Sequence, residues 1–366
     1  MSETPESNPG ALVVSSPKAL AIANRQLRIA GQALARIEQE RYIEFFATHP
    51  QASIAFVQGV SRYYPLTESL IERYAALLDW DMLSCNESIP WTDALIERYA
   101  DCWSWLGLSA NISLPWTEVF FSHYAERWDW KLLSHNTALP WSEAFLQCYV
   151  ERWDWPGISN NPGLPWVEGL IERYANRWDW SELSENSELP WSDALIARYA
   201  DRWDWASLSG NRGLPWITAL IERYAERWDW SELGMNSELP WDLALFEHYA
   251  ERWDWLTVSR NSELPWSETL IERYFDRWNW GGMFGLSNNE ALPWSEALIE
   301  RFADKWDWDG TFGLMSNPSL PWSEALIERY VDRWNWKNAS FNWRFPWTET
   351  LIGSPGFPGV KAVYKS

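Results

Sequence analysis

The sequence predicts an all-α solenoid, a stack of similar helical units that share one continuous core. Two observations predict it: the segment "LPWSDALIARYADRWDW" (residues 189–205) recurs almost unchanged, and no alternation of apolar and polar residues indicates a β-strand. A degenerate copy opens at Pro65, and the array holds about twelve units of 25–28 residues. The Pro-Trp pair then recurs at Pro90, Pro115, Pro140, Pro165, Pro190, Pro215, Pro240, Pro265, Pro293, Pro321 and Pro346.

Each unit is expected to begin with an α-helix. In the copy at residues 189–205, Ser192 has the position of an N-cap, and Trp191 and Ile196 have the spacing of a hydrophobic staple. The pattern predicts a helix over residues 192–204. One face of that helix carries the apolar residues Leu195, Ile196, Tyr199 and Trp203.

A shorter element is expected to follow the helix. Trp205 and Leu208 are three residues apart, as in a single turn of 3₁₀ or α-helix, and Asn211 and Gly213 are typical turn residues. One such unit cannot bury three indoles alone, so we expect the tryptophans to pack between repeats, each burying on the order of 150–250 Å². The alternative is an exposed indole platform that binds carbohydrate or another ligand.

Charged residues follow two columns along the predicted helices. An outward acidic face contains Glu172, Asp193, Asp201, Asp204, Glu222 and Glu272. A flanking column contains Arg173, Arg177, Arg198, Arg202, Arg223, Arg227, Arg273 and Arg277. Like charges four residues apart repel mildly on an isolated helix, so we expect these arginines to reach carboxylates of an adjacent repeat or to lie over a tryptophan ring. This inter-repeat ladder would align the stack.

Two consecutive units share a three-residue insertion, in "NWGGMFGLSNN" and "DWDGTFGLMSN". Phe284 and Phe312 should therefore lie side by side, as candidate partner-binding loops. The alternative is that both rings enter the core and adjust the curvature of the stack. The flanking glycines are Gly282, Gly285, Gly310 and Gly313.

Neither a metal site nor an active site is expected. His123 and Cys148 replace arginine in adjacent repeats, but zinc needs about four ligands, and exchange at a tolerant position is the simpler explanation. The segment "DKWDWDG" fails as a calcium loop because Lys305 and Ser316 occupy ligand positions. The carboxylates recur in every unit, whereas an active site is a singular constellation. We expect no cofactor and no enzymatic activity.

The regions outside the array have a different composition. Residues 1–17 are predicted to be disordered, residues 18–64 to form a helical cap that begins with a basic amphipathic helix, residues 65–352 to form the solenoid and residues 353–366 a Gly/Pro tail. The basic helix is a candidate for binding a partner or a membrane surface, for dimerisation, or for capping the stack. Its cations are Lys18, Arg25, Arg28 and Arg36.

The overall charge restricts the possible partners. The chain has 366 residues, 33 of them Trp, and a formal net charge of −21, which disfavours direct binding to nucleic acid and leaves room for a basic partner. The charge also serves solubility. No secretory signal and no run of about 18 apolar residues is visible, and three cysteines are too few for a disulfide framework. We therefore expect a cytoplasmic protein.

The motif "LSxN…LPWS…RWDW" resembles the tandem Trp-rich repeats of bacterial and giant-virus proteins over residues 65–352. Its alternation of an α-helix with a shorter 3₁₀-like turn is similar to the leucine-rich variant repeat. The resemblance implies an architecture and no activity. The sequence therefore favours a non-enzymatic protein–protein interaction scaffold that uses an acidic surface. The alternatives are a nucleic-acid-mimicking inhibitor of a basic DNA- or RNA-binding protein, and a self-assembling structural protein.

Overall fold

The computed structural model describes residue 41 and residues 54–348, and this part of the chain is helical, with no β-strand. The predicted all-α solenoid is therefore confirmed. None of the helices in these stretches combines the length and apolarity that crossing a bilayer requires. The predictions for residues 1–17, for the tail at 353–366 and for the basic helix with Lys18, Arg25, Arg28 and Arg36 lie outside the described residues.

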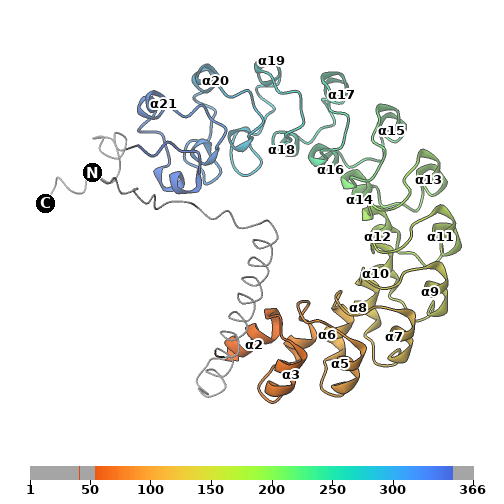
Figure 1. Cartoon of the computed structure of the whole chain (residues 1–366). Coiled ribbons are helices and arrows are strands. Elements are labelled where there is room, and N and C mark those ends of the chain that lie inside the picture. Colours follow the sequence, from red (N-terminus) through yellow and green to blue (C-terminus); the bar gives the residue numbers. More distant parts are fainter. Residues whose placement is uncertain (1–40, 42–53, 349–366) are drawn as a thin grey trace, which may run out of the picture. The chain divides into compact units, whose positions relative to one another are not determined.

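The chain divides into two compact units, residues 1–140 and residues 141–366. In each, every repeat contributes two helices in succession (Figure 1). After α2 (Ile54–Tyr63), the first helices of the repeats are α3 (Glu68–Tyr74), α5 (Asp93–Arg98), α7 (Glu118–His123), α9 (Glu143–Cys148), α11 (Glu168–Arg173), α13 (Asp193–Arg198), α15 (Thr218–Arg223), α17 (Leu243–His248), α19 (Glu268–Arg273), α20 (Glu296–Arg301) and α21 (Glu324–Arg329).

The second helices are shorter or equal in length, and three of them are 3₁₀-helices. They are α4 (Trp80–Ser84), α6 (Trp105–Ala110), α8 (Trp130–His135), α10 (Trp155–Ser159), α12 (Trp180–Glu185), α14 (Trp205–Gly210), α16 (Trp230–Met235), α18 (Trp255–Val258), η1 (Leu286–Asn288), η2 (Leu314–Ser316) and η3 (Trp336–Phe341).

In the second unit the two sets of helices form two rows (Figure 1). Consecutive second helices contact one another, as α12 does with α14 and α14 with α16. Each repeat is thus held by its immediate neighbours, which is the organisation of a solenoid.

The first helix is shorter than the sequence predicts. The Ser192 cap is confirmed, because its Oγ accepts the Leu195 N–H at 3.1 Å. The predicted helix over residues 192–204 was wrong, because α13 spans only Asp193–Arg198. The backbone leaves helical geometry at Tyr199 (φ −118°, ψ 26°), and the Trp203 indole N–H bonds the Ile196 carbonyl at 3.1 Å. An indole thus satisfies a carbonyl at the helix end, and the turn that follows brings Trp203 into the core.

The three tryptophans of a repeat all donate to backbone carbonyls. Besides Trp203, Trp191 donates to Asn186 and Trp205 to Ala200, each at 3.0 Å. The Trp203 ring is 4% exposed and lies 4.8 Å from the Trp180 ring of the preceding repeat, centroid to centroid. The predicted packing of tryptophan between repeats is confirmed, and in this repeat all three indole N–H groups are satisfied.

Within each unit, buried asparagines join repeats to the ones before them. Asn211 donates from Nδ2 to the carbonyls of Ser184 (2.7 Å) and Asn186 (3.2 Å), and its Oδ1 accepts the Gly213 N–H at 2.7 Å. The sequence indicated only a turn at this position, so the ladder is new. Equivalent bonds to the preceding repeat are made by Asn86, Asn111, Asn136, Asn186, Asn236, Asn261, Asn289, Asn317 and Asn342.

Candidate partner-binding surface

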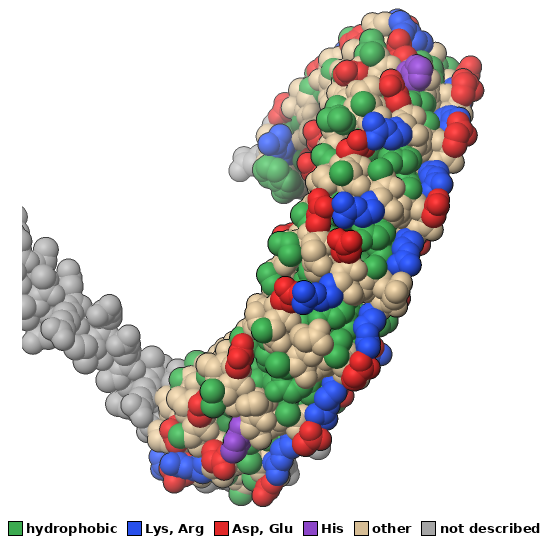
Figure 2. Space-filling model, turned by 90° about the vertical axis from the view of Figure 1, so that its right-hand side faces the viewer, with side chains coloured by type: hydrophobic (Ala, Val, Ile, Leu, Met, Phe, Trp, Pro, Cys, Tyr) green, Lys and Arg blue, Asp and Glu red, His purple; other side chains and the backbone are tan. Residues whose placement is uncertain are grey.

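On most of the first helices, one arginine faces carboxylates of the preceding repeat. Arg198 Nη1 lies 3.6 Å from a Glu168 carboxylate oxygen and 4.0 Å from one of Glu172. Figure 2 shows the resulting alternation of basic and acidic side chains over this face. Equivalent pairs are Arg173–Glu143, Arg223–Asp193, Arg273–Glu247, Arg301–Glu272 and Arg329–Glu300.

The second arginine of each repeat makes a larger set of contacts. Arg227 lies 2.8 Å from Asp201, donates to the Ala200 carbonyl at 2.6 Å, and stands 5.3 Å above the centre of the Trp205 ring. Arg177 has the same three kinds of partner, whereas Arg202 bonds the Asn176 amide oxygen in place of a carboxylate. Arg277 pairs with Glu251 and lies over Trp255.

The acidic face predicted on the first helices is therefore largely engaged within the protein. Glu172, Asp193, Asp201 and Glu272 each pair with an arginine of the next repeat. Asp204 caps α14 by accepting the N–H groups of Ala206 and Ser207. For Glu222 the structure places no cation within 4 Å among the described residues, and the residue 26 positions later is His248 in place of arginine.

The two kinds of arginine should differ in their response to salt. Arg198→Ala should lower the free energy of unfolding by about 0–0.5 kcal/mol at low ionic strength and by nothing measurable at about 1 M salt, because exposed ion pairs are weak and screened. Arg227→Ala should cost about 1 kcal/mol and keep most of that cost at high salt, because the carbonyl bond and the ring contact remain unscreened. Urea unfolding at both ionic strengths measures this, and equal salt sensitivity of the two variants would contradict it.

Histidine and cysteine replace arginine at this position of some first helices. His123 Nε2 lies 3.5 Å from Glu97 of the preceding repeat, in the place of the arginine–glutamate pair. The Tyr124 hydroxyl donates to the same carboxylate, and burial first, then this hydrogen bond, raises the pKa of Tyr124. Cys148 is an exposed free thiol. Across the described residues, no three side chains of the His, Cys, Asp or Glu type converge on a possible metal position.

The residue directly before each buried inter-repeat asparagine changes from repeat to repeat, although the residues around it recur. We call these residues, within the second unit, the variable column. They are exposed or half-exposed, whereas the similarly exposed Glu and Arg positions of the first helices keep the same residue in most repeats. The variable column consists of Asn160, Glu185, Gly210, Met235, Arg260, Asn288, Ser316 and Phe341.

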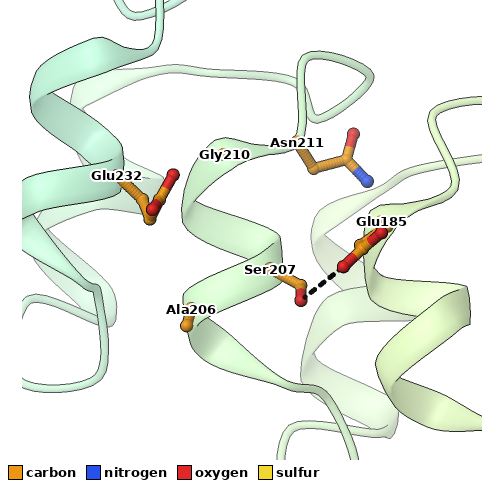
Figure 3. A pocket seen from close by; sticks show the side chains of 6 residues that line it. All are labelled: Glu185, Ala206, Ser207, Gly210, Asn211 and Glu232. Carbon is orange, nitrogen blue, oxygen red and sulfur yellow. Dashed lines mark hydrogen bonds between the residues drawn. The ribbon is translucent and has the colours of Figure 1, made fainter.

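Two depressions open along the variable column. The first, the acidic depression, has a volume of about 350 Å³ and lies over α14 (Figure 3). Glu185 of α12 and Glu232 of α16 flank it from opposite sides, and the small residues Ala206, Ser207 and Gly210 of α14 lie between them. The Ser207 hydroxyl donates to Glu185 at 3.3 Å. Two carboxylates thus face a space that small side chains leave open.

The two insertion loops are held together by one aspartate. Asp307 accepts the Gly282 N–H at 3.0 Å through Oδ2 and the Gly310 N–H at 2.7 Å through Oδ1. Gly282 has a φ of 73°, which favours glycine, and a Cβ at Gly285 or Gly313 would collide with backbone oxygens. The loops therefore need their glycines, and the first loop is held by an aspartate of the second.

The phenylalanines of these loops differ in environment. Phe284 is half-buried, and the Arg260 guanidinium lies 5.5 Å from its ring centre. Phe312 is 43% exposed. In the described part of the chain no ring contact joins Phe284 to Phe312, so the two rings do not form one pair, and neither is fully in the core.

Comparison of the chain with family models, with curated proteins and with solved structures finds no match to any of them. The tandem Trp-rich helical pattern is nevertheless plain in the structure, in which successive described repeats are built from the same two kinds of helix. Function therefore has to be inferred from the surfaces of the repeats.

Proposed function

We propose that this protein is a non-enzymatic interaction scaffold that binds a protein partner along the variable column of its second unit. One contrast carries the proposal. Most exposed Glu and Arg side chains of the first helices recur and pair between repeats, whereas the residues of the variable column differ, and four of them, Glu185, Gly210, Met235 and Arg260, line open depressions. A surface that differs at each repeat can recognise a different group of a partner at each repeat, and repeat proteins bind along such extended surfaces.

The charge of the acidic depression favours a basic partner. Glu185 and Glu232 flank small residues, so a lysine or arginine side chain fits between them. The net charge of −21 would steer such a partner toward the scaffold and increase its association rate. The sequence led us to expect an acidic binding surface on the first helices. In this proposal, the acidic binding surface lies on the second helices.

The proposed setting is a reducing one. Cys85, Cys102 and Cys148 are all free thiols, and a cytoplasmic location fits that state. The likeness to the Trp-rich repeats of bacterial and giant-virus proteins is part of the same proposal and assigns no activity to the chain.

Affinity capture from nuclease-treated native lysate tests the proposal. The full chain should retain a basic protein that salt releases, and Glu185→Gln with Glu232→Gln should reduce its recovery by about tenfold or more. The control, Glu172→Gln with Glu222→Gln, changes the net charge equally on the first helices and should leave recovery unchanged. Equal loss with both pairs would show only general charge attraction and would reject the variable column as the binding surface.

End-to-end assembly is a second candidate, favoured by one observation. Phe341 and Trp343, in the last described repeat, are 73% and 76% exposed, and exposed apolar side chains can dock on another copy. Recovery of the protein alone in the same capture would favour this candidate. Mimicry of nucleic acid is less well supported, because duplex DNA carries a charge about every 1.7 Å, whereas carboxylates of the first helices are paired with arginines.

A further inference from the structure

A second depression, the arginine depression, lies next to the acidic depression along the variable column. It has a volume of about 510 Å³, within the range of about 300–1,000 Å³ typical of ligand pockets. The lining includes Arg212, Met235, Arg260, Glu263 and Phe284. Helix α16 borders both depressions, with Glu232 in the first and Met235 in the second.

The two arginines of this depression differ from those of the first helices. Neither Arg212 nor Arg260 has a carboxylate within 4 Å among the described residues, although the chain holds 51 acidic side chains against 30 basic ones. Glu263 also lines the depression, and its carboxylate accepts the Ser262 hydroxyl at 2.9 Å. Two guanidinium groups against one carboxylate leave this part of an acidic protein locally basic, with N–H donors available for an anion.

An apolar surface accompanies this charge. Met235 is 44% exposed, and Phe284 is half-buried with Arg260 over its ring. The loop that carries Phe284 is held by the bond from Gly282 to Asp307 of the next repeat, so the ring is positioned before any ligand arrives. A methionine and an aromatic ring offer a flexible and a rigid apolar contact to a bulky side chain.

We propose that the arginine depression binds a short acidic peptide segment of the partner, in which a carboxylate adjoins a bulky apolar side chain. The carboxylate bonds Arg212 and Arg260, and the apolar side chain packs on Met235 and Phe284. This inference rests on the scaffold function proposed above and extends it. A segment along the variable column presents a basic residue to the acidic depression and an acidic–apolar pair to the arginine depression.

Fluorescence polarisation of labelled synthetic peptides on the full chain tests this inference. One peptide set carries Asp or Glu beside Phe, Trp, Leu or Met, a second carries Lys and Arg in their place, and a third separates the acid from the apolar residue. The first set should bind most tightly among the acidic peptides. Arg212→Gln with Arg260→Gln should weaken that binding by about tenfold or more, because two charge-assisted contacts are lost.

Two controls separate the possible results. Arg198→Gln with Arg223→Gln removes the same charge from the first helices and should leave binding of the first set unchanged. Binding of the basic set alone would overturn this inference and leave the scaffold function standing. Acidic–apolar binding that survives loss of Arg212 and Arg260 would also overturn it, and binding of no peptide set would count against both proposals.

Discussion

Trp203→Ala should lower the free energy of unfolding by about 3–5 kcal/mol, the range for removal of a large buried aromatic side chain. Trp203 is 4% exposed, and its ring packs against Trp180 of the preceding repeat and Trp191 of its own repeat. The distances between ring centroids are 4.8 and 4.9 Å. The variant leaves a cavity at the junction of two repeats and also removes the N–H that satisfies the Ile196 carbonyl. Packing and hydrogen bonding are therefore lost together.

The repeat architecture predicts how the unfolding transition of Trp203→Ala should change in shape. In a solenoid each repeat packs mainly on its immediate neighbours, so a defect at one junction uncouples the helices on either side of it and should broaden or split the urea transition followed by circular dichroism. Hydrogen exchange should show lost protection in α12, α13 and α14 first. Trp343→Ala serves as the control, because Trp343 is 76% exposed and its loss should cost less than about 0.5 kcal/mol. Similar effects of the two variants would contradict the assigned role of Trp203.

The period of the sequence was enough to predict the solenoid, because a segment of 25 residues with three indoles has no independent core. The predicted helix over residues 192–204 was too long because Tyr199 and Trp203 continue the helical spacing of apolar residues past the end of the helix. Periodicity reports which side chains are buried, and here the burial continues through a turn. Hydrogen bonding between Trp203 and Ile196, which fixes that turn, leaves no periodic signal.

The candidate surface was less predictable, because it depends on the register between repeats. Composition showed many carboxylates, but only the structure places Asp193 and Asp201 against Arg223 and Arg227 of the next repeat. The variable column was visible in the sequence as the changing residue before each recurring asparagine, and it could have been found by aligning the repeats. The arginine depression could not have been found in this way, since Arg260 and Phe284 meet only through the insertion loop.

Asn211→Ala should lower the free energy of unfolding by about 2–4 kcal/mol, although it removes a small polar side chain. Asn211 is 4% exposed and bonds the Ser184 carbonyl, the Asn186 carbonyl and the Gly213 N–H. The Asn186 carbonyl keeps the Trp191 indole as a donor, but the Ser184 carbonyl loses its Asn211 donor in a buried position. The expected loss comes mainly from that carbonyl and from the opened turn. Urea unfolding, with hydrogen exchange at the amide of Gly213, measures both parts.

Two further variants test whether the contribution of Asn211 depends on the hydrogen bonds that its side-chain amide donates. Asn176→Ala removes an exposed asparagine that accepts from Arg202, and it should cost less than about 0.5 kcal/mol. Asn211→Asp keeps the acceptor for Gly213 but directs a carboxylate at two carbonyls, so at neutral pH it should destabilise more than alanine does. Burial of that carboxylate would raise its pKa in the folded state above the unfolded value. The proton is then held more strongly when folded, so this variant should lose stability as pH rises and regain it as pH falls, and a pH-independent cost would contradict the donor role.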